Sequence, residues 1–275
     1  MMEFYSTENA CQEKPVNTPA VTNPRVSYTT SRVSPWLSPL AYLLGRHFLL
    51  PLFFRRIKII GQEHIPTTGP VILAPTHRAR WDALLVPYVA VGCVTGKHLR
   101  FMVAITECQG LQGWFVRRLG GFPVDIKHPS ITTLRHGVEL LQQKKTVVIF
   151  PEGGIYRDGE VHPLKQGIAR LALAAESSQP GLGVKVVPIS INYSQPYPKW
   201  GTDVCIQIGL PINAVDYTNG CVKKNAKHMT ADLALSLQQL TRISHKWEKN
   251  TWVSQILDNL IDTLSKYLNI VVKSK

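Results

Sequence analysis

Short, mostly apolar runs and longer segments of helical periodicity alternate along the chain from residue 57 onward. The short runs predict buried strands and cover 57–60, 71–74, 99–104, 146–150, 184–191 and 204–208. Apolar residues three or four positions apart predict helices over 83–94, 129–143 and 164–175, with further helices from about residue 226, including one over 253–268. Strands that alternate with helices indicate a mostly parallel or mixed sheet flanked by helices, so the expected fold class is α/β.

Two segments precede this α/β region, which we expect to span residues 57–275. Residues 1–33 are rich in Thr, Asn, Pro and Ser, which is typical of a disordered leader. Residues 34–56 contain an apolar stretch of nearly the roughly 20 residues that a membrane-spanning helix needs, but Arg46 and His47 lie in its middle. A charge at the bilayer centre costs roughly 2.5–3.5 kcal/mol. We therefore expect a helix or helical hairpin lying in the membrane interface; a helix that covers the protein's own core is the alternative.

The most informative feature of the composition is a strong positive charge. The chain has 31 Lys and Arg against 18 Asp and Glu, a net charge of +13, which favours an anionic partner. Basic residues are scattered among aliphatic ones and form no run of five, so nucleic acid fits less well than an anionic bilayer or a phosphorylated substrate. The five cysteines form no C-x-x-C pair, and no secretory signal opens the chain. These features favour a membrane-associated protein on the cytoplasmic side, with no metal site.

His77 and Asp82 follow the strand predicted at 71–74 and are candidates for acid–base chemistry. In a continuous helix of about 3.6 residues per turn, side chains five apart do not share a face. They can meet only if His77 lies in the turn after the strand and Asp82 in the first turn of the next helix. Asp82 would then orient the imidazole while its other nitrogen removes a proton from a hydroxyl group. The alternative is a solvated loop histidine beside an ordinary helix-start carboxylate.

A second candidate segment, Phe150-Pro-Glu-Gly-Gly154, follows the strand predicted at 146–150. Open α/β sheets bind ligands at the carboxyl ends of their strands. Gly153 and Gly154 permit positive φ and close backbone approach, so Glu152 is expected to point into the crevice and bind hydroxyls of a polyol acceptor. A backbone N–H of this turn could hold an oxyanion. The alternative is an ordinary strand-to-loop turn with an exposed glutamate.

Lys165 stands in His162-Pro-Leu-Lys-Gln-Gly167, which we expect to open a helix. Its side chain and the backbone N–H groups there could bind a phosphate group. A solvated lysine is the alternative.

Together these segments resemble the HX4D and FPEG blocks of the glycerolipid acyltransferases, the family that contains the 1-acyl-glycerol-3-phosphate acyltransferases. The segment 113–125 resembles the family's second block, and 187–191 resembles its fourth, a strand whose proline lines the pocket. The resemblance covers about residues 57–212. It implies transfer of a fatty acyl group from acyl-CoA or acyl-carrier protein to the hydroxyl of a lysophospholipid, with His77 as base, Asp82 as its partner and no further cofactor.

Two departures from the family pattern concern the acceptor. Ile126 stands where the second block commonly ends in Arg, and Gly154 and the two residues after it stand where FPEG is commonly followed by Thr-Arg-Ser. Those arginines are the family's expected ligands for the acceptor phosphate. Lys127, Arg157 and Lys165 could replace them, although Lys lacks the bidentate fork of Arg. We expect 1-acyl-glycerol-3-phosphate as acceptor; another lysolipid, a neutral alcohol, or a non-catalytic lipid-binding role are the alternatives.

Overall fold

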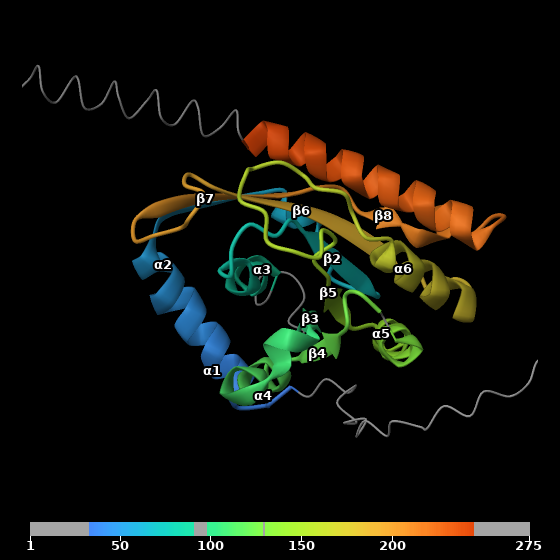
Figure 1. Cartoon of the computed structure of the whole chain (residues 1–275), viewed down its shortest axis with the longest axis horizontal. Coiled ribbons are helices and arrows are strands. Elements are labelled where there is room, and N and C mark those ends of the chain that lie inside the picture. Colours follow the sequence, from blue (N-terminus) through green and yellow to red (C-terminus); the bar gives the residue numbers. More distant parts are fainter. Residues whose placement is uncertain (1–32, 91–97, 129, 245–275) are drawn as a thin grey trace, which may run out of the picture.

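An eight-stranded mixed sheet is the centre of the structure, a computed structural model that describes residues 33–90, 98–128 and 130–244 (Figure 1). Its strands are β1 (Phe54–Ile60), β2 (Val71–Pro75), β3 (Arg100–Ala104), β4 (Gly121–Val124), β5 (Thr146–Val148), β6 (Lys185–Tyr193), β7 (Thr202–Ile208) and β8 (Ile212–Asn213). They are ordered β1-β7-β6-β2-β5-β3-β4, with β8 beside β6. β6 runs antiparallel to β7 and β8, and the other pairs are parallel, which confirms the predicted α/β class.

Helices cover both faces of the sheet. They are α1 (Leu37–Leu44), α2 (Leu50–Phe53), α3 (Asp82–Ala90), α4 (Gly110–Arg118), α5 (Ile131–Gln142), α6 (Gly167–Ser178) and a helix over 222–244. The first two are joined by a π-helical turn, η1 (Gly45–Leu49), and short 3₁₀ turns lie at η2 (Gln62–His64), η3 (Ile105–Cys108) and η4 (Ala214–Tyr217). One apolar core joins the sheet to α5, α6 and helix 222–244, and the other joins it to α2 and α3.

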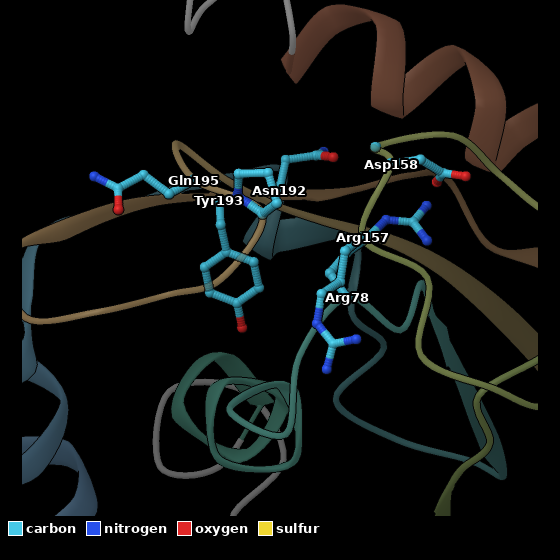
Figure 2. A pocket seen from close by; sticks show the side chains of 8 residues that line it. Arg78, Arg157, Asp158, Asn192, Tyr193 and Gln195 are labelled. Carbon is cyan, nitrogen blue, oxygen red and sulfur yellow. The ribbon is translucent and has the colours of Figure 1, made fainter.

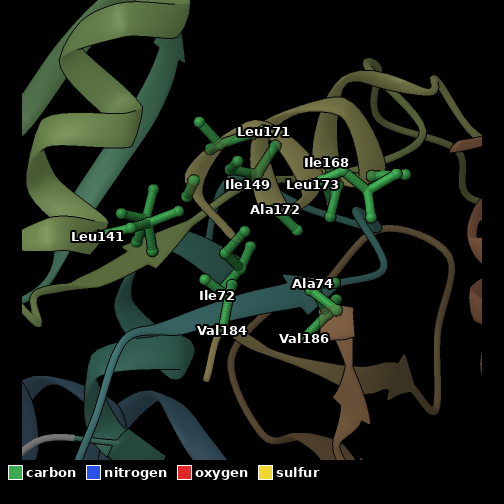
Figure 3. Packing of buried hydrophobic residues seen from close by; sticks show 14 of the residues in the cluster. Ile72, Ala74, Leu141, Ile149, Ile168, Leu171, Ala172, Leu173, Val184 and Val186 are labelled. Carbon is green, nitrogen blue, oxygen red and sulfur yellow. The ribbon is translucent and has the colours of Figure 1, made fainter. Parts of the chain in front are cut away.

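Strand β2 shows why its sequence is apolar without interruption. Successive side chains of a strand point to opposite faces of its sheet. Ile72 and Ala74 therefore lie in the core under α5 and α6 (Figure 3), whereas Val71 and Leu73 lie in the core under α3. Both sets are almost completely buried. The strand is therefore apolar at every position because both of its faces are covered.

The apolar N-terminal segment forms one helical rod through α1, η1 and α2, not a hairpin. We expected the helical segment to continue to residue 56. The rod ends at Phe53, and residues 54–56 belong to strand β1 instead. Pro51 lies inside the rod, directly after the π-helical turn, and it cannot donate a backbone hydrogen bond back to that turn. Large apolar side chains of the rod, and of Trp36 directly before it, are exposed: Trp36, Leu40, Leu43, Leu44, Phe48, Leu49 and Leu52. Among the described residues, no helix combines the length and apolar character needed to cross a membrane.

Several expectations differ in detail or lie elsewhere. The last predicted helix, 253–268, and nearly all of the leader 1–33 lie outside the described residues. Pro188, which we expected to line a pocket, is buried. Its ring and the side chain of Leu240, from helix 222–244, both lie close to Gly209. It therefore contributes to the core instead of the site.

Candidate active site

His77 and Asp82 meet at the carboxyl edge of the sheet. His77 lies two residues after the end of β2, and Asp82 is the first residue of α3. His77 Nδ1 lies 2.9 Å from Asp82 Oδ2, while 19% of the histidine side chain is exposed. Asp82 is completely buried. The imidazole thus has one nitrogen on a carboxylate, the arrangement required for a base whose second nitrogen faces a substrate.

The connection between β2 and α3 folds around the Asp82 carboxylate. Its Oδ2 accepts hydrogen bonds from the backbone N–H groups of Arg78 at 2.6 Å and Ala79 at 2.8 Å. Thr76, before His77, is tied to β6 because its hydroxyl accepts from the backbone N–H of Ile191 at 2.9 Å. Each bond fixes a backbone atom within a few residues of His77. The imidazole is therefore held by the fold and not by its own side-chain torsions alone.

Tyr193, at the end of β6, completes the shell of Asp82. Its hydroxyl donates to Asp82 Oδ1 at 2.5 Å. Burial and then the neighbouring Asp82 charge raise the pKa of Tyr193 well above its ordinary value, so the hydroxyl keeps its proton and remains a donor. Figure 2 shows Tyr193 extending from the strand end toward α3. Both carboxylate oxygens of Asp82 thus have partners.

Glu152 lies in the same region but is not available to a substrate. It forms a buried ion pair with Arg78, whose Nη1 lies 2.9 Å from Glu152 Oε2. Its carboxylate also accepts from the backbone N–H groups of His77 at 3.3 Å and His162 at 3.4 Å. Burial raises the pKa of Glu152, and the Arg78 charge offsets part of this shift. The expectation that Glu152 points into the crevice is wrong, because its oxygens are occupied by these protein donors.

The glycine turn after β5 brings further groups beside His77. The Phe150 ring stacks on the His77 imidazole at 4.1 Å between centroids. Gly153 has φ of +69°, which L side chains rarely adopt, and a Cβ there would approach Ile126 and Lys165 at 3.5 Å. A Cβ on Gly154 would lie 3.4 Å from the ring of Tyr156. The turn therefore packs closely beside the His77–Asp82 dyad, with a glycine conformation at residue 153. The Gly153 N–H donates to Phe150 O at 3.3 Å, so this N–H is already used.

The predicted phosphate ligands are exposed and do not form one cluster in the structure. Lys165 precedes α6, which begins only at Gly167, and its backbone N–H donates to Pro151 O at 2.8 Å. The guanidinium of Arg157 lies 4.9 Å from the centroid of the Tyr197 ring. Lys127 follows β4 and is exposed. Lys165 is the one of the three that the structure brings beside the glycine turn, through its contact with Gly153.

A cavity of about 160 Å³ adjoins the dyad on the side of Tyr193. Its walls come from the end of β6 and the loop after the glycine turn: Arg78, Arg157, Asp158, Gly159, Asn192, Tyr193, Gln195 and Pro196 (Figure 2). Asp158 is held there by His162 Nε2 at 2.6 Å, and this bond lowers the pKa of Asp158. Most residues that line the cavity are polar or charged, and the cavity continues the site away from His77.

Residues 56–192 match the protein-family model described as Acyltransferase. This stretch contains the His77–Asp82 dyad and the glycine turn. The chain belongs to the acyltransferase family.

Curated relatives of this acyltransferase share part of their length with it. The mitochondrial glycerol-3-phosphate acyltransferase 1 of Mus musculus is 30% identical over 139 residues, which are 47% of this chain and 17% of the mouse protein. The 1-acyl-sn-glycerol-3-phosphate acyltransferase of Bacillus subtilis is 27% identical over 117 residues, 42% of this chain and 56% of its own. The chain thus spans less than a fifth of the mouse protein and just over half of the bacterial one.

The fold of this acyltransferase also occurs in a solved structure. The crystal structure of the 1-acyl-sn-glycerophosphate acyltransferase PlsC from Thermotoga maritima superposes with a TM-score of 0.54 at 21% identity. The match covers 74% of this chain and 78% of that one. At this identity the likeness concerns the fold.

Two site residues of this acyltransferase were not predicted from its sequence. Arg78 follows His77 directly, but only the fold shows that Glu152 is its partner. Tyr193 lies 111 positions beyond Asp82, and its role depends on how far β6 extends past β2. The one sequence signal for Tyr193 is a polar aromatic residue at the carboxyl end of an otherwise apolar strand.

Proposed function

We propose that this acyltransferase moves a fatty acyl group from an acyl thioester, acyl-CoA or acyl-carrier protein, to the free hydroxyl of 1-acyl-glycerol-3-phosphate, forming phosphatidic acid. The observation that carries the proposal is the His77 imidazole held against the fully buried Asp82 beside a glycine turn. The family membership supports acyl transfer as the reaction class. The names of the mouse and Bacillus relatives support a glycerol-based acceptor.

The proposed step is direct attack without an acyl-enzyme. His77 Nε2 removes the proton of the acceptor hydroxyl, whose oxygen forms a bond with the thioester carbonyl carbon. The carbon–sulfur bond then breaks, and the leaving thiolate receives the proton from the imidazolium. Asp82 stabilises that imidazolium between the two transfers. The Asp82 carboxylate keeps the Nδ1 proton on the imidazole, which leaves Nε2 as the nitrogen that accepts.

The basic side chains near the site support an anionic acceptor. Lys165 lies against the glycine turn, and Arg157 lies on the wall of the adjoining cavity. Lys127, next to Ile126, is the third candidate for the phosphate. Against this, Ile126 presents 40% of its surface to solvent where an arginine would serve a phosphate better. Ile126 is the observation that favours the second candidate function, the same chemistry on a neutral alcohol or another lysolipid.

We also propose that the rod formed by α1, η1 and α2 attaches the enzyme to a membrane surface at its cytoplasmic side. The exposed apolar side chains of the rod support this location. Arg55 and Arg56, which follow the rod in β1, would lie near anionic headgroups. A lipid acceptor would then reach the site from the membrane on which the enzyme lies.

The test is incubation of the purified full chain with labelled acyl-CoA and a panel of lysolipids and alcohols, with products identified by mass. His77→Ala and Asp82→Asn should each lower turnover by roughly 10⁴-fold or more, to a small residual rate, while the circular dichroism spectrum stays unchanged. Near wild-type turnover in either variant refutes the mechanism. Loss on Arg157→Gln or Lys165→Gln confined to phosphate-bearing acceptors supports 1-acyl-glycerol-3-phosphate, whereas product only from uncharged acceptors supports the second candidate. Vesicle binding with no acyl product from any acceptor would identify a lipid-binding protein instead.

A further inference from the structure

We propose that Tyr193 is a positioning residue that holds Asp82 in the orientation His77 requires, and that β6 acts through it on the reaction centre. The proposal rests on the proposed function of His77 as the base. It concerns a residue outside the motif segments, contributed by the far end of another strand. The argument depends on the geometry of the Asp82 carboxylate.

The two oxygens of Asp82 have different partners. Oδ2 accepts from His77 Nδ1 and from two backbone N–H groups of the same loop. Oδ1 accepts from the Tyr193 hydroxyl, which comes from β6. Among the hydrogen bonds of the described residues, Tyr193 is thus the donor that acts on the oxygen facing away from His77. A partial rotation of the carboxylate would break this bond and turn Oδ2 away from Nδ1.

β6 is built to bring Tyr193 to this place. It pairs in parallel with β2 up to the partners Pro75 and Ile189, and then continues four residues beyond β2 to Tyr193. The extension is fixed on its other edge by antiparallel pairing with β7, where Tyr193 lies opposite Val204. The Tyr193 ring also stacks on Phe54 at 5.9 Å. The hydroxyl is therefore held by the sheet and by ring packing, and it fixes the carboxylate in turn.

The hydrogen bond has one consequence for catalysis. It keeps Oδ2 directed at Nδ1, so that Nε2 points to the acceptor hydroxyl. The charged groups closest to this contact, Arg78 and Glu152, pair with one another. Loss of the Tyr193 hydroxyl should thus misalign the base.

The experiment compares Tyr193→Phe with Tyr217→Phe in the full chain. Tyr217 is a matched control because its hydroxyl donates to Asp232 at 2.7 Å, in a pair formed by η4 and helix 222–244. Tyr193→Phe should lower kcat by roughly 10- to 100-fold, the change that corresponds to losing one hydrogen bond to a charged group. KM should stay unchanged, because the hydroxyl acts on the orientation of the base and not on substrate binding. Tyr217→Phe should leave both kcat and KM as in the wild type.

A second measurement separates positioning from general damage. In an Asp82→Asn background, Tyr193→Phe should cause no further loss of the residual rate, because Tyr193 acts on the reaction only through the Asp82 carboxylate. A multiplicative further loss, or a wild-type kcat in the single variant, overturns the proposal. If His77→Ala is itself active, the proposed function fails instead, so the two failures are distinguishable. Melting temperatures of all variants show that the rates compare folded proteins.

Discussion

The buried carboxylate of Glu152 should be a structural requirement of the active site, and Glu152→Gln tests this directly. The substitution keeps the shape of the side chain but removes its charge. It leaves the Arg78 guanidinium buried, with 4% of its side chain exposed, and without its anionic partner. It also places an amide N–H₂ where one carboxylate oxygen accepted from the backbone N–H of His77 or His162. Removing one partner of a buried ion pair costs about 3–5 kcal/mol, mostly because the remaining charge is uncompensated.

Glu176→Gln is the matched control for this change. Glu176 is also buried, and its carboxylate accepts from the backbone N–H groups of Gly183 and Val184 before β6. Its replacement should cost about 1–3 kcal/mol, the range for a buried group left without a partner. Glu152→Gln should therefore be the more damaging of two otherwise similar substitutions. Only Glu152→Gln should lower acyl transfer in the fraction that remains folded, because only Glu152 holds the backbone of His77.

The assay is chemical unfolding followed by circular dichroism, with turnover measured below the unfolding transition. For a domain of this size, a loss of 3–5 kcal/mol corresponds to a fall in melting temperature of roughly 6 to 20 °C. The double variant Arg78→Met/Glu152→Gln removes both charges and should recover part of the loss, with a coupling energy of about 0.5–3 kcal/mol. Equal destabilisation by Glu152→Gln and Glu176→Gln, together with additive effects in the double variant, would refute the reasoning.

Three further predictions follow from other parts of the structure. Gly61→Ala should destabilise by several kcal/mol more than Gly69→Ala in urea unfolding, because both have positive φ but only the Gly61 Cβ would meet a backbone carbonyl of β7, at 2.2 Å; equal losses would contradict this. Ile126→Arg should raise the preference for phosphate-bearing over neutral acceptors about 10-fold or more in the substrate panel, and an unchanged ratio would exclude an acceptor phosphate beside residue 126. Burial opposes ionisation of Asp203, but the hydrogen bonds from Arg55 and Arg56 outweigh it and lower the pKa of Asp203 below its ordinary value of 3.8. The ionised carboxylate therefore stabilises the fold above pH 3.8, and this contribution is lost as the pH falls through the lowered pKa. Asp203→Asn should flatten the dependence of stability on pH below about pH 4, and an unchanged dependence would contradict the role of these ion pairs.

The strands and helices could be predicted largely because their signals are local. β2 and α3 follow from an unbroken apolar run and from a helical pattern that starts at Asp82. α4 could not be predicted in the same way, since its glycines and arginines give little helical periodicity. Its Gly113 is there because a Cβ would lie 2.1 Å from the Cys108 carbonyl, which is a tertiary requirement. A short strand such as β8 depends in the same way on its neighbour in the sheet.

In the candidate site too, local contacts could be predicted from the sequence and contacts between distant residues could not. The His77–Asp82 contact needs only a strand, a turn and a helix start, all of which are visible in the sequence. The burial of Glu152 was not predicted because its Arg78 partner lies 74 positions away. Tyr193 depends on the register of β6 against two neighbours, which apolar periodicity does not specify. Sequence patterns therefore indicated which residues could take part in acid–base chemistry or binding, but not which residues hold those side chains in place.

The difference between buried residues that orient His77 and exposed residues that could bind the acceptor has a functional consequence. The two buried carboxylates, Asp82 and Glu152, accept hydrogen bonds from backbone N–H groups of the loop around His77, so the imidazole that we propose as the base is oriented before any substrate binds. The basic candidates for acceptor recognition, Lys127, Arg157 and Lys165, are exposed and long, and they must lose rotamer freedom on binding. Changes at the carboxylates should therefore appear in kcat, whereas changes at the basic residues should appear in KM. A site arranged in this way can change its acceptor by substitution at the exposed residues while the alignment of the base stays intact.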